Sequence, residues 1–411
     1  MKVCFETFGC RLNRAEALQQ EAEYVAAGWE RTVRHDDADL IVVRGCAVTA
    51  KAQAECERLV RHIREKYPTT RVLLEGCVES RRGKRETAVG SVAKRLVSKL
   101  AGADPMHVEP SDAVTPTRTA RAYLKVQDGC SCKCTFCIVP QFRGTSASVP
   151  FGDVLDKARR FIDAGYRELV VTGCNLSLYA SEDRRLPELV AALAALDPSG
   201  CRIRLGSVSP GGPALEVVHA VAEHANVCNF LHVPLQTASN LLLSEMRRPY
   251  DSAAIEQMLG LATKLIPNVG LGCDLMTGFP GEDNLDFVAT KGLLARYPFS
   301  NAHVFPYSER PDTSAALMRR SVPKPIRSER AHALSAIAAH ARSAFARKFV
   351  GKTVEMVIED EKTLGGWTAE YLWCTLPGEI GNASRFNLKR KDKVTFKVVE
   401  ARHGLLRGMP V

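Results

Sequence analysis

Three cysteines close together in the middle of the chain are the residues best suited to chemistry. Cys130, Cys134 and Cys137 have the spacing C-x3-C-x2-C. Iron–sulfur clusters are usually held by four thiolates, so three thiolates would leave one iron with an open coordination position, as catalytic metal sites have. An open iron can bind a reactant. The spacing therefore predicts a reactive iron–sulfur cluster.

Other uses of these thiols stay open on the spacing alone. Cys132 adds a fourth cysteine to the same stretch. Four cysteines so close together could also hold a structural zinc ion, or contain a redox-active pair with a bystander.

Composition and charge narrow the class of protein. A chain of 411 residues with 45% hydrophobic and 25% charged residues is expected to fold into two or three packed domains. It has neither an apolar run long enough to span a bilayer nor a signal peptide pattern, so we expect a cytoplasmic protein without a membrane partner. Its 14 cysteines then indicate reduced thiols and metal ligation. The net charge of +10 favours a polyanionic partner such as nucleic acid.

The first hundred residues alternate between strand-like and helix-like segments. Strands are expected at 2–8, 39–44 and 71–75, with helices at 14–28 and 47–67. This βαβαβ pattern predicts a parallel sheet.

Each of these strands is followed by a Gly-Cys pair, which places Cys10, Cys46 and Cys77 at equivalent positions. The carboxyl ends of parallel strands share one edge of a sheet, so we expect a second set of three thiolates there. Burial in the core is the commonest fate of a single free cysteine. We assign that role to Cys4 and Cys56, which lack this placement.

The central region also alternates strand and helix, from residue 122 to about residue 320. It predicts a partial parallel barrel whose active site lies at the carboxyl ends of the strands. The expected strands are 122–127, 169–173, 202–207, 230–236, 270–279 and 301–307.

The last sixty residues alternate apolar and polar positions at 353–359 and 393–401, after a basic helical stretch at 328–349. This pattern predicts a small antiparallel barrel. Basic side chains gather on it and in a second patch near the N-terminal domain; they could bind RNA phosphates or simply face solvent. They are Lys389, Arg390, Lys391 and Lys393 on the barrel, and Arg81, Arg82, Lys84 and Arg85 in the second patch.

The cysteine triplet with Phe136 before its last cysteine, the motif Thr7 to Asn13 (TFGCRLN), Cys46 and Gly76-Cys77 together resemble the radical S-adenosylmethionine (SAM) methylthiotransferase family. The Gly-Cys-Arg-Leu-Asn form is most similar to the branch that modifies N6-threonylcarbamoyladenosine in tRNA. This chain departs from the family at Arg44-Gly45 and at Val78-Glu79-Ser80.

The resemblance implies two 4Fe-4S clusters and S-adenosyl-L-methionine as cofactors. Cys130, Cys134 and Cys137 would hold the cluster that binds SAM, with Cys132 incidental, and Cys10, Cys46 and Cys77 would hold an auxiliary cluster. Asn175, Gln236 and Asp274 would bind SAM or substrate, and no side chain is assigned as a general acid or base; His232 and His303 are expected to be structural. The implied partners are tRNA, an electron donor such as a flavodoxin or ferredoxin, and a sulfur source.

The expected fold is α/β, in three domains. Residues 1–101 form an open parallel α/β domain, 102–119 a linker, 120–349 a partial (β/α)6 radical-SAM barrel, and 350–411 a small antiparallel β-barrel of the TRAM type, which binds RNA.

The expected activity is conversion of N6-threonylcarbamoyladenosine next to the anticodon to its 2-methylthio derivative. Alternatives are methylthiolation of isopentenyladenosine in tRNA or of a ribosomal-protein aspartate. A non-enzymatic, zinc-containing RNA-binding protein is an alternative of another class.

Overall fold

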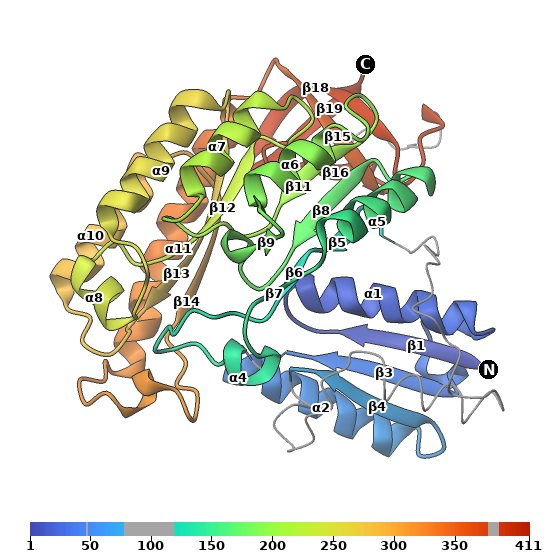
Figure 1. The fold of residues 1–411 in the computed structure, drawn as a ribbon, viewed down its shortest axis with the longest axis horizontal. Coiled ribbons are helices and arrows are strands. Elements are labelled where there is room, and N and C mark those ends of the chain that lie inside the picture. Colours follow the sequence, from blue (N-terminus) through green and yellow to red (C-terminus); the bar gives the residue numbers. More distant parts are fainter. Residues whose placement is uncertain (47, 78–118, 377–385) are drawn as a thin grey trace. The chain divides into compact units, whose positions relative to one another are not determined.

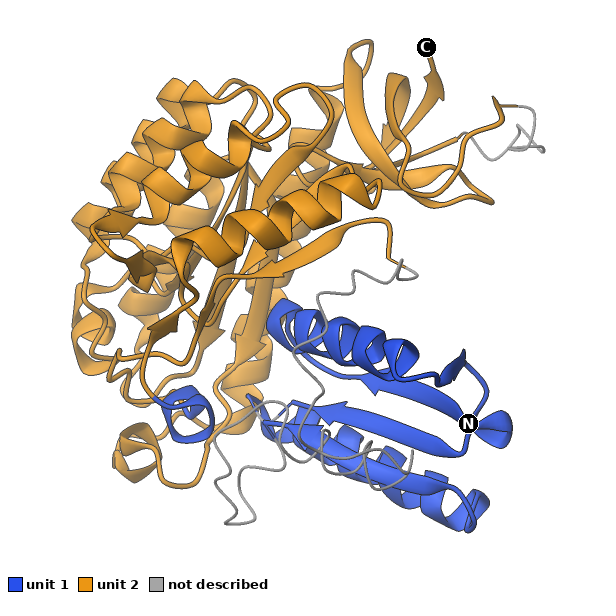
Figure 2. Ribbon diagram, turned by 45° about the vertical axis from the view of Figure 1, so that its right-hand side comes forward, with its two compact units in different colours: residues 1–118, 138–144 blue, residues 119–137, 145–411 orange. Residues whose placement is uncertain are grey.

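The computed structural model describes residues 1–46, 48–77, 119–376 and 386–411 (Figure 1). The basic patch at 81–85 and the predicted linker, apart from its last residue, lie outside these ranges. Contacts divide the chain into two compact units, coloured separately in Figure 2. Unit 1 comprises residues 1–118 and 138–144, and unit 2 comprises 119–137 and 145–411.

The N-terminal part of unit 1 is a four-stranded parallel sheet of order β2-β1-β3-β4, which confirms the predicted βαβαβ pattern. Its strands are β1 (Lys2–Thr7), β2 (Glu30–Thr32), β3 (Leu40–Gly45) and β4 (Arg71–Gly76). Its helices are α1 (Arg11–Ala26), α2 (Ala50–Lys66) and the 3-10 turn η1 (His35–Asp37). The short edge strand β2 was not predicted, because three residues, Glu-Arg-Thr, carry no apolar alternation.

Burial explains why β3 is the central strand of this sheet. All six of its residues are buried, and it pairs with β1 on one side and β4 on the other. The apolar run Leu-Ile-Val-Val is typical of parallel strands covered on both faces. The next helix, α2, begins after Thr49, whose hydroxyl accepts a hydrogen bond from the Ala52 amide at 3.2 Å.

Unit 2 begins with six parallel strands, as predicted for a partial barrel, and helices run along their outer side (Figure 1). They form two three-stranded sheets, of order β11-β8-β5 and β12-β13-β14. Parallel bridges from Ile203 to Val227 and from Ser207 to His232 join the two halves. The strands are β5 (Ala122–Lys125), β8 (Glu168–Thr172), β11 (Arg202–Leu205), β12 (Phe230–Gln236), β13 (Gly270–Thr277) and β14 (Phe299–Pro306).

Helices and short ribbons complete this region. The helices are α4 (Val139–Arg143), α5 (Phe151–Asp163), α6 (Leu186–Ala194), α7 (Ala214–Glu223), α8 (Asn240–Glu245), α9 (Ser252–Leu265), α10 (Asn284–Arg296) and α11 (Lys324–Arg347), with 3-10 turns η4 (Leu176–Leu178) and η5 (Ser314–Leu317). The ribbons pair β6 (Gln127–Asp128) with β7 (Ala147–Ser148), and β9 (Ala180–Ser181) with β10 (Arg184–Arg185). Helix α11 begins four residues before the predicted basic helix, because Pro325 suits a first helical turn. Within the described ranges, no helix is long and apolar enough to cross a membrane.

The C-terminal residues form a closed five-stranded barrel, as predicted, in the order β15-β16-β17-β19-β18. One pair of neighbours, β17 and β19, is parallel, whereas the prediction was antiparallel throughout. Met356, Phe396 and Leu406 are fully buried at its centre. The strands are β15 (Thr353–Asp360), β16 (Gly365–Thr368), β17 (Trp373–Thr375), β18 (Lys393–Arg402) and β19 (Leu405–Pro410).

A buried group of charges attaches this small barrel to the strands of unit 2. Glu168 on β8 is fully buried and accepts hydrogen bonds from Arg202 at 2.7 Å and from Arg204 at 2.6 Å. Both arginines also donate to backbone carbonyl oxygens of the small barrel, at Trp367 and Thr368 respectively. The carboxylate of Glu168 thus orients two guanidinium groups that connect the strands of the partial barrel to the small barrel.

Candidate metal centres

The first candidate centre lies at the carboxyl edge of the N-terminal sheet. Cys10 follows β1 and is the residue before helix α1, Cys46 follows β3, and Cys77 follows β4. Because β1, β3 and β4 are neighbours, the three cysteines share one edge, and Cys46 and Cys77 each interact electrostatically with Cys10. The structure therefore brings together the three thiols that the Gly-Cys pairs predicted.

Glycine is required before two of these cysteines. A Cβ atom on Gly9 would lie 2.5 Å from Cys46 Cβ and 2.7 Å from its sulfur, and φ at Gly9 is +93°. A Cβ atom on Gly76 would lie 2.7 Å from the carbonyl oxygen of Gly45, and φ there is +84°. Only glycine tolerates both this backbone conformation and this approach, so the Gly-Cys pairs allow the loops to pack closely.

Two residues that the sequence analysis did not single out hold these loops. Asn13, fully buried, donates from Nδ2 to the carbonyl oxygens of Phe8 at 2.9 Å and Gly45 at 3.0 Å. Arg143 of helix α4 donates to Asn13 Oδ1 at 3.0 Å and hydrogen-bonds the sulfur of Cys77. The signal for Asn13 was its place at the end of the Gly-Cys-Arg-Leu-Asn motif; no local pattern marked Arg143.

Burial favours the protonated form of two of these thiols. Burial raises the pKa of Cys46 to about 11. Burial also raises the pKa of Cys77, although the charge and hydrogen bond of Arg143 oppose it. Metal ligation deprotonates such thiols, so binding a cluster here would release protons.

The second candidate centre is the loop between β6 and α4, which carries Cys130, Cys134 and Cys137, all partly exposed. Gln127, fully buried, holds this loop: its Nε2 lies 2.7 Å from the carbonyl oxygen of Gly129. Its Oε1 accepts from the Asn175 backbone amide at 3.0 Å. Gln127 therefore links the cysteine loop to the end of β8, a role that sequence reasoning missed.

Cys132 and Arg248 contact two of the predicted ligands. A hydrogen bond from Cys132 lowers the pKa of Cys130, favouring the thiolate that ligates iron. Arg248 donates to Cys134 Sγ at 3.2 Å and to the Tyr250 hydroxyl at 2.8 Å.

Asn175 and Gln236 lie at strand ends but differ in how many of their side-chain hydrogen-bonding groups already have a partner. Asn175 Oδ1 accepts from the Ser177 amide at 3.2 Å, which caps η4, and its Nδ2 lies 3.7 Å from Cys132 Sγ. Gln236 ends β12 with φ of +66°. Among the residues that the structure describes, none hydrogen-bonds the Gln236 side chain, so its amide is available to a bound molecule.

Asp274 on β13 is shared by two histidines of the neighbouring strands. His232 Nε2 lies 3.0 Å from Asp274 Oδ2, and His303 Nδ1 lies 3.1 Å from Oδ1. Burial opposes ionisation of Asp274, but His232 and then His303 outweigh it and hold the pKa of this carboxyl well below its ordinary value. His232 and His303 thus orient Asp274, and the three residues offer ligand atoms within 4.8 Å of one another; the structural role of the two histidines stays a prediction.

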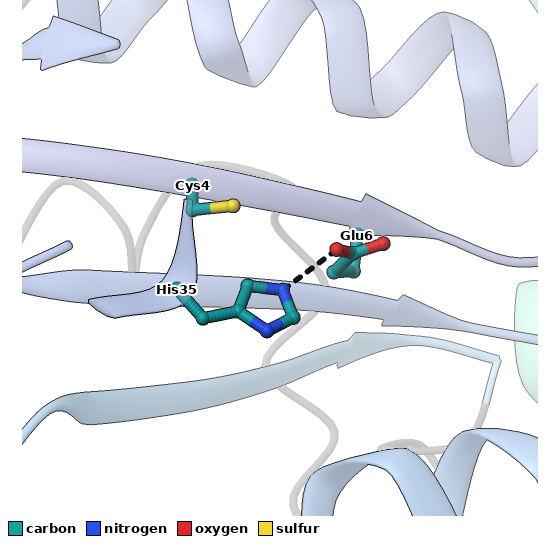
Figure 3. Close-up of side chains that lie close together, drawn as sticks. All are labelled: Cys4, Glu6 and His35. Carbon is teal, nitrogen blue, oxygen red and sulfur yellow. Dashed lines mark hydrogen bonds and ion pairs between the residues drawn. The ribbon is translucent and has the colours of Figure 1, made fainter. Parts of the chain in front are cut away.

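One further group of metal-ligand types lies in unit 1, apart from the predicted cysteine set (Figure 3). Cys4, Glu6 and His35 have ligand atoms within 4.8 Å of one another. His35 Nε2 already pairs with Glu6 at 2.7 Å, and Cys4 is buried in the apolar core beneath α2, as predicted for it. We interpret this group as a hydrogen bond between His35 and Glu6 beside a core cysteine.

The basic side chains on the small barrel are only partly free for RNA. The Lys391 ammonium lies 3.6 Å from the centre of the Tyr166 ring, and Lys393 Nζ lies 2.7 Å from the carbonyl oxygen of Ser199 and 3.2 Å from Glu355. Lys389 and Arg390 are exposed, and Arg390 Nε donates to the carbonyl oxygen of Glu359 at 3.0 Å. Three of the four predicted phosphate-binding residues therefore contact the protein itself, and Arg390 does so while remaining exposed.

Both cysteine sets fit iron–sulfur clusters by their chemistry. All 14 cysteines are free of disulfides, and each predicted set offers three thiols from loops held by buried side chains, Asn13 in one and Gln127 in the other. Three thiolates would leave one iron of each cluster open to another ligand.

Comparison with known proteins agrees with this chemistry. The model of the radical SAM superfamily matches residues 124–294, and the model described as uncharacterized protein family UPF0004 matches residues 2–97. The chain is 32% identical to a tRNA-2-methylthio-N(6)-dimethylallyladenosine synthase of Corynebacterium efficiens, over 86% of this chain and 74% of that protein. It is 28% identical to the threonylcarbamoyladenosine tRNA methylthiotransferase MtaB of Bacillus subtilis, over 92% of this chain and 90% of that protein.

A solved structure shares the fold at low sequence identity. It is the radical SAM methyltransferase TsrM of Kitasatospora setae, solved with cobalamin and a [4Fe-4S] cluster bound. The TM-score is 0.55 at 14% identity, over 77% of each chain, which shows a common fold only.

Proposed function

This chain belongs to the radical SAM methylthiotransferase family and is a tRNA methylthiotransferase, and we propose that its substrate is N6-threonylcarbamoyladenosine beside the anticodon. The observation that carries this choice is the motif from Gly9 to Asn13, Gly-Cys-Arg-Leu-Asn, whose last residue holds two cysteine loops together. The relative named for this nucleoside, which the chain matches over nine tenths of both lengths, supports it.

The cofactors are SAM and 4Fe-4S clusters. We assign one cluster to Cys130, Cys134 and Cys137, and the auxiliary cluster to Cys10, Cys46 and Cys77. When bound, SAM and its cluster supply a carbon radical by one-electron cleavage, and the auxiliary cluster supplies sulfur. The chain's own part is to bind, orient and exclude water.

Three residues remain our proposed contacts to SAM or substrate. The Gln236 side-chain amide has no hydrogen-bond partner among the described residues, and Asn175 Nδ2 contacts the sulfur of Cys132. Each oxygen of Asp274 contacts one histidine and has a second lone pair that can accept a hydrogen bond from a bound molecule. We therefore expect Gln236→Ala to weaken SAM or substrate binding without changing iron content.

We propose the domain division 1–101, 102–119, 120–349 and 350–411, with RNA contacts on the last domain. The net charge of +10 favours a structured RNA over a protein loop as the substrate. Adenine C2 lies on the Watson–Crick edge of the base, so an unpaired anticodon-loop base is the form that the mouth of a partial barrel can accept. A flavodoxin or ferredoxin would supply electrons, and a separate donor would supply sulfur.

A second candidate substrate is isopentenyladenosine in tRNA. It is favoured by the 32% identity to the dimethylallyladenosine synthase of Corynebacterium efficiens. The two substrates differ at N6, where one carries a carboxylate and the other an apolar chain.

Mass spectrometry of tRNA nucleosides from a strain lacking the gene decides between them. We expect loss of the 2-methylthio derivative of N6-threonylcarbamoyladenosine. Loss of methylthio-isopentenyladenosine alone would show that the substrate assignment is wrong while leaving the reaction class intact.

A further inference from the structure

Arg143 joins the central part of the sequence to the candidate centre of the N-terminal sheet. It ends helix α4, which begins two residues after Cys137, yet residues 138–144 belong to unit 1 (Figure 2). Phe142 anchors this segment by packing against the core cluster that contains Cys77. The side chain of Arg143 is therefore fixed within the N-terminal unit.

The guanidinium group of Arg143 is held on two sides. It forms a bidentate pair with Glu16, from Nη1 to Oε1 at 2.9 Å and from Nη2 to Oε2 at 3.0 Å, and Nη2 also donates to Asn13 Oδ1 at 3.0 Å. Its side chain is only 10% exposed. Bidentate arginine–carboxylate pairs fix both distance and plane, and the guanidinium group held in this way also hydrogen-bonds the Cys77 sulfur.

The charges around Arg143 balance. Glu16 also pairs with Arg44 at 2.8 Å, and Arg44 pairs with Glu75 at 3.0 Å. Two arginines thus face two glutamates, which lets the group stay buried in spite of the desolvation that isolated charges suffer. What distinguishes Arg143 from Arg44 is the hydrogen bond to a predicted cluster ligand.

We propose that Arg143 is a positioning residue for the auxiliary cluster. Arg143 holds the Cys77 ligand through an N–H···S hydrogen bond and thereby raises the reduction potential of that cluster. The inference rests on the cluster assignment made under the proposed function. Hydrogen bonds to ligand sulfur stabilise the more negative, reduced cluster, and they are among the main determinants of cluster potential.

The test measures the potential of the auxiliary cluster alone. In full-length protein with Cys130, Cys134 and Cys137 changed to Ala, the cluster is reconstituted anaerobically and titrated with dithionite, which supplies the electron, while EPR follows the reduced form. Arg143→Met and Arg143→Lys are compared with the parent and with Arg61→Met, which removes an exposed arginine of helix α2 in the same unit.

We expect a lower potential for Arg143→Met, a smaller decrease for Arg143→Lys, which keeps the charge but cannot bridge Glu16 and Cys77 together, and no change for Arg61→Met. A merely structural role would reduce iron content and thermal stability without moving the potential of the clusters that remain. An unchanged potential in Arg143→Met would overturn the inference; if that variant takes up no iron, an unchanged potential in Arg143→Lys would do so.

Failure of the cluster assignment has a different signature. If Cys10, Cys46 and Cys77 changed together to Ala leave the iron content of the otherwise wild-type chain unaltered, no auxiliary cluster is held there. That result would contradict the proposed function and not the role of Arg143 alone.

Discussion

Asn13 donates a hydrogen bond from its side-chain amide to the carbonyl oxygen of Gly45 at 3.0 Å. The same nitrogen bonds the carbonyl oxygen of Phe8, so one buried side chain ties the loop before Cys10 to the loop before Cys46. Register in the sheet brings β1 and β3 together, but this amide fixes how their ends meet.

Changing Asn13 to Ala should therefore disturb the auxiliary site. We expect a loss of about 1–3 kcal/mol in stability, because the carbonyl oxygens of Phe8 and Gly45 each lose a donor, together with loss of about half of the reconstituted iron. Asn226→Ala is the matched control, since Asn226 Nδ2 also donates to buried carbonyl oxygens, those of Ala194 and Cys201, but in unit 2. Urea denaturation and iron analysis of both variants provide the measurement, and equal iron loss in the two would contradict the prediction.

Glycine at position 9 should be needed for space as well as for conformation. Gly9→Ala would place Cβ within 2.7 Å of the Cys46 sulfur, whereas Gly28, with a similar φ of +87°, has nothing within 4 Å of an added Cβ. Both alanine variants carry the strain of left-handed backbone, roughly 1–2 kcal/mol. We expect only Gly9→Ala to lose the auxiliary iron, as judged by iron content and EPR; retention of that iron would show that Cys46 can move aside.

Glu168→Gln should weaken the attachment of the small barrel, in a pH-dependent way. Burial alone would raise the pKa of Glu168, but Arg202, Arg204 and Arg121 outweigh it and lower the pKa below the ordinary value of 4.5. The stabilisation by Glu168 is thus fully present above about pH 4.5 and is lost as the pH falls through the lower, folded value. Removing the charge of Glu168 leaves three buried arginines without this carboxylate, which lowers the free energy of unfolding by about 3–5 kcal/mol near neutral pH.

Chemical denaturation at several pH values tests this expectation. The difference in unfolding free energy between wild type and Glu168→Gln should be largest at neutral pH and shrink below pH 4.5. Glu216→Gln, at an exposed pair with Arg185, should change stability by less than about 0.5 kcal/mol at any pH. A constant difference across the acid range would mean that the ionised carboxylate is not what stabilises the joint.

RNA affinity should depend more on Lys389 and Arg390 than on their basic neighbours. Neutralising both exposed residues should flatten the dependence of tRNA binding on salt, by roughly one unit or less for each phosphate that the protein no longer neutralises. Neutralising Lys391 and Lys393, which contact Tyr166, Ser199 and Glu355, should change the slope less and stability more. Filter binding across a salt series distinguishes the two pairs, and equal slopes for both double variants would refute this division.

The sequence by itself determined the main strands and helices and the placement of the Cys10, Cys46 and Cys77 set at one edge of a sheet. Apolar runs such as the one in β3, and glycines placed before Cys10, Cys46 and Cys77, are local patterns, and parallel topology brings strand ends to one edge without further information. The six strands of the partial barrel and the closed C-terminal barrel followed from the same periodicities.

Only the tertiary structure decided which side chains serve those sites. Asn13 and Gly45 lie 32 positions apart, Arg143 and Glu16 lie 127 apart, and Arg204 reaches Thr368 across 164 positions. The periodicity of apolar residues in the sequence does not predict such pairings. Each pairing depends on how separate elements pack and on which buried polar group then needs a hydrogen-bond partner. The same holds for Lys391 and Lys393. Their charges suggest contacts with RNA at the surface, but in the folded chain they contact Tyr166 and Ser199.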